Sequence, residues 1–494
     1  MLKECKVFDL VSLPEGKKAI RNRWVFDIKP DGWKHACLVA KGFSQMEGID
    51  YEELFSSVVC YEPVRIIFTL TALEHWHSEA VDVKTAFLYG KLDEEIYMQQ
   101  PEGFVQKGHE KLVLRLNHAI YGLKQAALAW WKELEALMKR LGFTQLHSDA
   151  GVFHHKWFNV VIITYVDDCV FAGKNKSNVL KLKIQFMKIW ECWDLGEAKE
   201  FLKMRIWQVG KKLILDQQDY LKKIVTWFGL DNAKSAITPL PEWYEPEENK
   251  GTCTPEFRQQ YQSVIGSLLY IMLGTLPDIS YAVIKMAQFA SNPSLDHMNK
   301  AKQIIRYLGS SPDLSLVFDG GSDKGIIAFC DSDWASDKIK HKSQTDYFFQ
   351  LASTSISWQS RAQKTIALSS IEAEYMALCD CCKQAKWIKT LLSELGINVG
   401  PIPVNGDNQG SILLGSNPVQ GNRSKHIDIW YHFIWQCIED KEAKLYFVEG
   451  AENPANMFTK ALGHIKFSKF RGQLGFENKW LLIQLNANVE LGAT

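Results

Sequence analysis

The stretch VVIITYVDDCVFAG, from Val160 to Gly173, sets two adjacent aspartates between two apolar runs. The β-branched residues on either side predict two strands of a hairpin, with Asp167 and Asp168 at its tip. Two carboxylates beside a buried strand pair are destabilising unless a cation compensates them. Magnesium suits hard oxygen ligands, and two ions about 4 Å apart can stabilise both oxygens of a nucleotidyl transfer. The hairpin tip therefore predicts a metal site.

A third carboxylate supports this interpretation. Asp82 in VDVKTAFLYG follows a short apolar segment, and an Ala-Phe pair comes four residues after it. The alternative is an exposed Asp-Asp turn, which is the more common explanation of such a pair taken alone. The order D-x-x-x-A-F followed by YVDD resembles the two acidic motifs of a reverse transcriptase palm, and this resemblance favours the metal site over the turn.

Length and composition bound what the chain can be. Its 494 residues suggest about three domains of roughly 150 residues each. The hydrophobic fraction of 46% is typical of a globular protein. Lys plus Arg and Asp plus Glu both total 57, so any groove for nucleic acid must be locally basic.

Cysteine usage and hydropathy indicate an intracellular protein. The 11 cysteines have no regular spacing, which argues against a secreted disulfide framework. The Cys379–Cys382 CxxC pair lacks a second half, so we expect it to be structural rather than a zinc site. The N-terminus lacks a signal-peptide run and no apolar segment is long enough to span a membrane, so we expect a cytoplasmic or nuclear location.

Two proline- and glycine-rich stretches, Pro239–Phe257 and Gly309–Gly325, divide the chain into three segments. The first segment mixes strands with amphipathic helices, the middle is helical, and the last alternates strands with helices. We therefore expect an α+β fold. Strands are expected at RWVFDI, VVIITYV, IIAFC, YFFQL and SISW, and helices at Leu128–Leu141, Tyr261–Leu273, Asp278–Phe289, Ile371–Leu395 and Ile427–Ile438.

The last segment carries a second acidic set. Asp331 follows the expected strand IIAFC, Glu372 and Glu374 lie in the expected helix ALSSIEAEYMAL, and Asp407 follows PIPVNG. Alone, each acid is more often a surface residue. Together they have the strand-end, helix, strand-end order of a site where carboxylates hold metals that activate water. Glu372 and Glu374 point about 200° apart on a helix, so only one of them can face such a site.

Several further motifs occur in an order that resembles copia-type retrotransposon Pol polyproteins, over roughly Lys17 to Phe476. They fall on both sides of the two acidic sets. The motifs are LVAKGF (38–43), GIDYEELFSSVV (48–59), EIYMQQPEGF (95–104), YGLKQA (121–126), FLKMRI (201–206), DSDWAS (331–336), KTIALSSIEAEYMAL (364–378), GDNQGSI (406–412) and KHIDIWYHFI (425–434).

The resemblance implies a right-hand polymerase followed by an RNase H-like α/β domain with a mixed sheet. The implied segments are residues 1–240 for fingers, palm and the start of the thumb, 241–315 for a helical thumb or connection, 316–478 for the RNase H-like domain, and 479–494 for a C-terminal tail. The implied activity is RNA-directed DNA polymerisation with RNA-strand hydrolysis. The implied partners are an RNA template, a DNA primer, an RNA–DNA hybrid and dNTPs, with two Mg²⁺ or Mn²⁺ ions per site.

By the same resemblance, individual residues acquire roles. Asp82, the Val83 carbonyl, Asp167 and Asp168 would hold the polymerase metals. Phe87 would exclude a 2′-hydroxyl, or be an ordinary core residue, and Gln125 would border the nucleotide pocket. Asp331, Glu374 and Asp407 would hold the hydrolytic metals, with Glu372 in reserve and Asp333 structural. FLKMRI resembles a primer-positioning hairpin. Lys41, Lys84 and Lys124 are candidates for backbone contacts or solvated charges.

The chain departs from the family pattern at several positions. Cys37 stands where the family carries a phosphate-contacting Arg, and Ala127 and Leu128 replace Pro and Arg. Lys203 replaces a Gly, whose backbone angles other residues adopt only at a cost. Asn456 replaces a fourth metal-facing Asp, and Asp346 replaces a Gly.

Three functions are compatible with these patterns. The first is a working reverse transcriptase with RNase H activity. The second is a catalytically silent remnant that binds nucleic acid or a protein, which the departures favour. The third, an unrelated nucleotidyl transferase sharing only a palm, is disfavoured by the second acidic set. The oligomeric state does not follow from the sequence.

Overall fold

The computed structural model describes residues 6–28, 32, 34–322, 325–336, 341–416 and 428–492, with parts of KHIDIWYHFI and of the second proline- and glycine-rich stretch outside them. The chain forms two compact units, residues 1–60 with 77–198 and residues 61–76 with 199–494. The chain therefore passes three times between the units, after residues 60, 76 and 198. These limits fall at other positions than the proline-rich stretches, because helix α1 (Tyr61–Leu73) packs against strands of the second unit.

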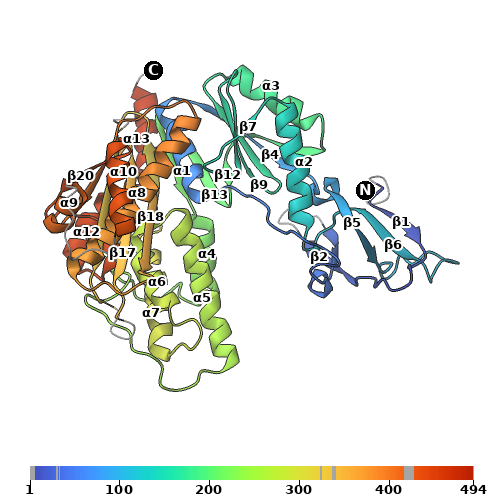
Figure 1. Cartoon of the computed structure of the whole chain (residues 1–494), viewed down its shortest axis with the longest axis horizontal. Coiled ribbons are helices and arrows are strands. Elements are labelled where there is room, and N and C mark those ends of the chain that lie inside the picture. The colour runs from blue at the N-terminus through green and yellow to red at the C-terminus, as the bar shows by residue number, and fades with distance from the viewer. Residues whose placement is uncertain are drawn as a thin grey trace. The chain divides into compact units, whose positions relative to one another are not determined.

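A six-stranded antiparallel sheet forms the centre of the first unit (Figure 1). It contains the hairpin predicted around the two adjacent aspartates, since β9 and β10 pair through Cys169 and Thr164. In spatial order its strands are β11 (Cys192–Glu197), β4 (His77–Val83), β10 (Asp168–Gly173), β9 (Val160–Tyr165), β8 (Val152–His155) and β7 (Thr144–Gln145).

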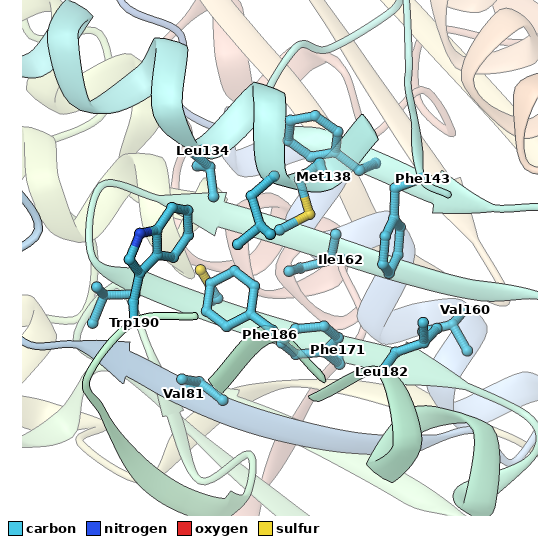
Figure 2. Close-up of a cluster of buried hydrophobic side chains, with 14 of the residues drawn as sticks. Val81, Leu134, Met138, Phe143, Val160, Ile162, Phe171, Leu182, Phe186 and Trp190 are labelled. Carbon is cyan, nitrogen blue, oxygen red and sulfur yellow. The ribbon is translucent and has the colours of Figure 1, made fainter. Parts of the chain in front are cut away.

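Helices α2 (Ala126–Arg140) and α3 (Lys176–Met187) cover one face of this sheet. Alternate residues of a strand share a face, so Ile162 and Phe171 meet the helices while their neighbours do not. Figure 2 shows Leu134 and Met138 of α2 and Phe186 of α3 converging on these strand residues. The resulting apolar core fixes the strands that carry the acidic residues.

The rest of the first unit consists of smaller elements. Strands β1 (Phe8–Val11), β6 (Val113–His118) and β5 (Lys91–Met98) form one sheet, and β2 (Asn22–Ile28) pairs with β3 (Lys34–Ala40) as a hairpin. The short helix η1 (Gly42–Ser44) follows β3, and the short helix η2 (Ala86–Tyr89) precedes β5. A second apolar cluster around Ile96, Leu116 and Ile120 holds these elements together.

The second unit contains two five-stranded sheets. The first has the order β12 (Glu200–Phe201), β13 (Met204–Val209), β14 (Lys212–Asp216), β15 (Leu314–Asp319) and β21 (Phe476–Asn478). Four helices follow β14, namely α4 (Gln218–Trp227), α5 (Pro255–Gly274), α6 (Ser280–Ala287) and α7 (Leu295–Ser310), with η3 (Pro277–Ile279) before α6. The hairpin that contains FLKMRI therefore shares a sheet with strands far along the chain.

The second sheet of this unit is mixed. Its order is β18 (Thr354–Ala362), β17 (Gln344–Leu351), β16 (Ile326–Asp333), β19 (Ile402–Gly406) and β20 (Ala443–Phe447). The first three strands are antiparallel, and β19 runs parallel to both β16 and β20. Helix α8 (Ser370–Glu394) packs on β16 and β17 and contacts α9 (Gln409–Ser416) and α10 (Asp428–Glu439), and α11 (Asn456–Thr459) contacts β16 to β18.

Helices α12 (His464–Gly472) and α13 (Lys479–Gly492) end the chain. The fully buried Lys479 donates from Nζ to Asp216 Oδ2 at 2.8 Å and to Gln218 Oε1 at 2.7 Å. This buried contact attaches α13 to the end of β14.

The predicted α+β architecture with its mixed sheet is confirmed. The helices expected near Leu128–Leu141 and Ile371–Leu395 correspond to α2 and α8, and the middle segment is helical as expected. Inside the second linker, however, Leu314–Asp319 forms β15, because its apolar residues pair with β14. Within the described residues, no helix is both long enough and apolar enough to cross a membrane.

Arg65 of α1 is 2% exposed and joins three elements of the second unit. Its Nε donates to the Ile356 carbonyl of β18 at 2.7 Å. Its Nη1 donates to the carbonyls of Leu273 at 2.7 Å and Gly274 at 3.1 Å, which end α5 and have no partner within that helix. The guanidinium also lies 3.8 Å from the Trp358 ring centroid. Burial lowers the pKa of Arg65 to about 10, partly opposed by Glu62.

We expect Arg65→Met to lower the free energy of unfolding of the second unit by at least about 3 kcal/mol, because each unpaired buried carbonyl costs about 1–3 kcal/mol. Calorimetry on the full chain measures this. Lys222→Met on the exposed face of α4 is the control and should change stability by less than about 0.5 kcal/mol. Equal stability of the two variants would show that Arg65 is dispensable.

Candidate functional site

The first acidic set lies where β4 ends and β10 begins. Asp168 and Asp82 are directly opposite each other in the antiparallel register, so their side chains share one face of the sheet. The backbone N–H of Val83 donates to the Asp167 carbonyl at 2.9 Å, which joins the hairpin tip to the end of β4. All three carboxylates are partly exposed. The fold therefore brings together the acids that the sequence motifs singled out.

The turn between β9 and β10 is held in a costly backbone conformation. Val166 has φ of 56°, a left-handed angle that a β-branched residue adopts at a cost of about 1–2 kcal/mol. The indole N–H of the buried Trp130 donates to the Val166 carbonyl at 2.7 Å. Trp130 belongs to α2, so the helix over the sheet orients the turn that carries Asp167.

Tyr121 lies beside the same acids. Burial raises the pKa of Tyr121 to about 12, and the charges of Asp167 and Asp82 add to the shift. Its ring meets the Phe87 ring edge-on, with centroids 4.8 Å apart. Phe87 is partly buried and packs against both apolar clusters of this unit. The two rings thus form an aromatic wall near the carboxylates.

Gln125 is buried, and its side-chain amide forms hydrogen bonds within the protein. It accepts from Gln45 Nε2 at 2.9 Å and donates to the Asp50 carbonyl at 2.8 Å. The side chain therefore joins the loop after β3 to the start of α2, and any role at a nucleotide pocket would act through that loop.

The three candidate lysines differ in their surroundings. Lys84 pairs with Glu191 at 2.6 Å and lies over the Trp193 ring. Lys124 donates to the Tyr51 hydroxyl at 2.9 Å. Lys41 precedes η1 and is partly exposed. Lys84 and Lys124 thus have protein partners, while the side chain of Lys41 is partly open to solvent.

The second acidic set converges more tightly. Asp331 of β16, Glu374 of α8 and Asp407, directly after β19, place ligand atoms within 4.8 Å of one another. In the described part of the chain no other group of three His, Cys, Asp or Glu residues does so, and Asp82, Asp167 and Asp168 do not. Three carboxylate oxygens at one point fit a hard divalent cation such as Mg²⁺.

The electrostatics of this cluster also favour a cation. Burial raises the pKa of Glu374 well above its usual range, and Asp331 and Asp407 add to the shift. Burial and the charge of Asp331 raise the pKa of Asp407 to about 6. The nearby cation is Lys460, whose Nζ lies 3.7 Å from Asp331 Oδ2. One lysine faces three carboxylates, and the excess negative charge would attract metal ions.

The two glutamates of α8 occupy different environments. Glu372 Oε2 accepts from the backbone N–H of Leu368 at 2.8 Å, and its own N–H donates to Ser369 Oγ at 3.2 Å. These are bonds of the helix N-terminus. Glu374 instead lies with Asp331 and Asp407. The geometry therefore favours Glu374 over Glu372 as the ligand.

Comparisons with known proteins agree with the motifs. The family described as "Reverse transcriptase (RNA-dependent DNA polymerase)" matches residues 5–242. The transposon Ty5-1 protein of Saccharomyces cerevisiae is 31% identical over 304 residues, which cover 60% of this chain and 97% of that protein. The chain belongs to the copia-type retrotransposon Pol polyprotein family.

Relatives in plants are longer. The Pol polyprotein from transposon TNT 1-94 of Nicotiana tabacum is 38% identical over 487 residues, which cover 95% of this chain and 36% of that protein. The chain thus spans about a third of the length of that Pol polyprotein. Among solved structures, the foamy viral protease-reverse transcriptase dRH in complex with double-stranded DNA has a TM-score of 0.47 and 12% identity, and the match covers 90% of this chain and 68% of that chain.

The structure locates the departures from the Pol pattern. Cys37 lies on β3, and burial raises the pKa of its thiol. Ala127 and Leu128 lie in the first turn of α2. Lys203 and its neighbour Leu202 have φ of 59° and 52° in the turn between β12 and β13, so Lys203 does adopt the angle that favours glycine. Cys379 and Cys382 are buried inside α8.

Near the second set, Asn456 is 3% exposed, and its Nδ2 donates to the carbonyls of Gly450 at 2.9 Å and Asn453 at 3.1 Å. Gly450 lies so close to Asp407 that an added Cβ would meet Asp407 Oδ2 at 2.8 Å. Asn453 hydrogen-bonds Asp407 and donates to the Cys330 carbonyl at 2.9 Å. These amides shape the loop against which Asp407 packs.

Sequence reasoning missed three neighbours of the acids. Trp130 positions the hairpin tip, Thr459 donates from Oγ1 to Asp331 Oδ2 at 2.7 Å, and Lys460 supplies the nearby positive charge. Trp130 is one of 17 tryptophans and carries no local signal. Thr459 and Lys460 stand in the stretch NPANMFTK (453–460), in which Asn456 at the position of the family's aspartate is the more prominent feature.

Asp407 should make the metal-free protein less stable as the pH rises from about 4 to 6. Its pKa in the folded protein, about 6, exceeds the ordinary value, so the folded state holds this proton more tightly. Ionisation above pH 6 then opposes folding. Asp407→Asn should therefore gain melting temperature over the parent as the pH rises, and added Mg²⁺ should shrink that gain. A gain that is the same at pH 4 and pH 7 would contradict this account.

Proposed function

We propose that this chain is an RNA-directed DNA polymerase with RNase H activity. The observation that carries the proposal is that each unit holds its own carboxylate set, Asp82 opposite Asp168 on adjacent strands in one, and Asp331 and Asp407 at strand ends with Glu374 of α8 in the other. Membership of the Pol family supports it.

In the polymerase site, Asp82, Asp167, Asp168 and the Val83 carbonyl would hold two Mg²⁺ or Mn²⁺ ions. Such ions stabilise the attacking primer hydroxyl and the leaving oxygen at the α-phosphate of a dNTP. Trp130 would keep the turn in place through the Val166 carbonyl. The reaction needs little more from side chains than this alignment.

In the hydrolytic site, Asp331, Glu374 and Asp407 would hold the cations that activate water against an RNA phosphodiester. Lys460 reduces the repulsion between these carboxylates, and Thr459 orients Asp331 by a hydrogen bond. The RNA strand of an RNA–DNA hybrid would be the substrate.

We also propose that the segments of the chain have the separate functions that the motifs imply. Residues 1–240 would carry polymerisation, 241–315 the helical connection, 316–478 hydrolysis, and 479–494 a C-terminal extension. The hairpin of β12 and β13 would position the primer, with its tip held by the hydrogen bond from Tyr270 to the Leu202 carbonyl at 2.7 Å.

A second candidate is a silent remnant that binds nucleic acid without catalysis. The buried, uncharged Asn456 and the strained turn at Lys203 favour it. The two candidates make opposite predictions for activity of the purified chain.

Primer extension on an RNA template should require Asp167 and Asp168. The Asp167→Asn, Asp168→Asn double variant should lose extension by at least about 100-fold, because neutral amides hold divalent cations poorly. It should retain hydrolysis of an RNA–DNA hybrid.

The reciprocal variant is Glu374→Gln, which should lose hydrolysis and keep extension. Glu372→Gln is its matched control, since a glutamine at position 372 can still accept the Leu368 hydrogen bond. A well-folded parent that shows neither activity with Mg²⁺ or Mn²⁺ would replace the enzyme proposal with the remnant.

Phe87→Ala should let the polymerase accept ribonucleotides. Removing the ring opens space beside Tyr121, and discrimination against a 2′-hydroxyl should fall by about tenfold or more. Single-nucleotide incorporation with matched dNTP and rNTP measures the ratio, and Phe87→Tyr should preserve it. An unchanged ratio in Phe87→Ala would assign Phe87 to the core alone.

A further inference from the structure

Asp346 is a buried carboxylate beside the second acidic set. It lies directly opposite Asp331 in the pairing of β17 with β16, and it is 1% exposed. Its Oδ1 accepts a hydrogen bond from the backbone N–H of Asp331 at 3.1 Å. Its Oδ2 has no hydrogen-bond partner among the described residues. A buried carboxylate oxygen without a partner is costly, so it needs an explanation.

The side chain of Asp346 lies on the face that α11 covers. Alternate strand residues share a face, so Asp346 lies on the same side of the sheet as Phe348. The Phe348 ring stacks on Phe458 of α11, with centroids 5.6 Å apart. On this face Asp331 Oδ2 accepts from Thr459 of α11. Asp346 therefore lies on the face of β17 that is covered by α11, the helix that begins at Asn456.

The charges around Asp346 are those of the acidic set. Asp331 and Glu374 act on it with the same sign, and Lys460 opposes them. Asn456 brings no charge to this region, because its side-chain amide is neutral, and its Nδ2 bonds the Gly450 and Asn453 carbonyls. One lysine thus stands against four carboxylates when Asp346 is counted with Asp331, Glu374 and Asp407. A divalent cation is the ligand that such a set favours.

We propose that Asp346 strengthens cation binding at the Asp331–Glu374–Asp407 site, supplying from β17 the negative charge that Asn456 lacks. The inference rests on the proposed hydrolytic function of that site. Asp346 also fixes Asp331 through its backbone N–H, so it would act both by charge and by orientation of a ligand.

Mn²⁺ binding without nucleic acid tests this directly. Calorimetric titration and the electron paramagnetic resonance signal of free Mn²⁺ would be measured in the Asp167→Asn, Asp168→Asn background, so that the hydrolytic site is the one titrated. Asp346→Gly and Asp346→Asn should each raise the dissociation constant by about 10- to 100-fold. Glu372→Gln, two residues from Glu374 and outside the set, should leave it unchanged.

The Asp346→Asn variant separates the effect of the side-chain charge from the effect of the side-chain size. It has the shape of aspartate without its charge, so weak binding by Asp346→Asn in a protein with the parent's melting temperature supports the inference. Dissociation constants of Asp346→Gly and Asp346→Asn within twofold of the parent would overturn it while leaving the hydrolytic proposal standing. A parent that binds Mn²⁺ no better than its Asp331→Asn variant would instead overturn the hydrolytic function itself.

Discussion

Arg65 is the contact on which the second unit depends. Its guanidinium satisfies carbonyls of α5 and β18 and stacks on Trp358, so a helix that lies between two segments of the first unit in the sequence is fixed within the second. The same device recurs elsewhere. Lys183 binds Glu79 at 2.6 Å in the first unit, and Lys479 binds Asp216 in the second. In each case a fully partnered buried cation joins elements that are distant in the sequence.

The second acidic set shows the opposite arrangement. Glu79 and Asp216 each have a protein cation within 2.8 Å, whereas Asp331, Glu374, Asp407 and Asp346 share the charge of Lys460. Such under-compensation opposes folding, and a protein retains it where an external charge completes the site. This contrast separates the carboxylates that hold the fold together from those that we propose to work on a substrate.

Much of the fold and of the candidate site could be predicted from sequence. Apolar runs predicted β9, β10 and β16, and the motif order grouped Asp82 with the YVDD acids, which the fold places on neighbouring strands. The rest depends on tertiary contacts that leave no local pattern. The bond from Trp130 to Val166 joins residues 36 positions apart, and the pairing of β14 with β15 crosses a stretch expected to be a linker. Asp346 was noticed as a departure, but its position opposite Asp331 requires the strand register.

The attachment of α13 has a consequence for how the chain acquires its structure. Lys479 and Asp216 are separated by 263 positions, and β21 closes the sheet that β12 to β14 begin. Synthesis of that interval takes roughly 13 to 50 s at about 5–20 residues per second. During this time β14 first lacks its partner β15, and β15 then lacks its partner β21, so one edge of the growing sheet stays unpaired. Such an edge is prone to pair with other chains, so newly made copies are vulnerable to aggregation until β21 has been synthesised.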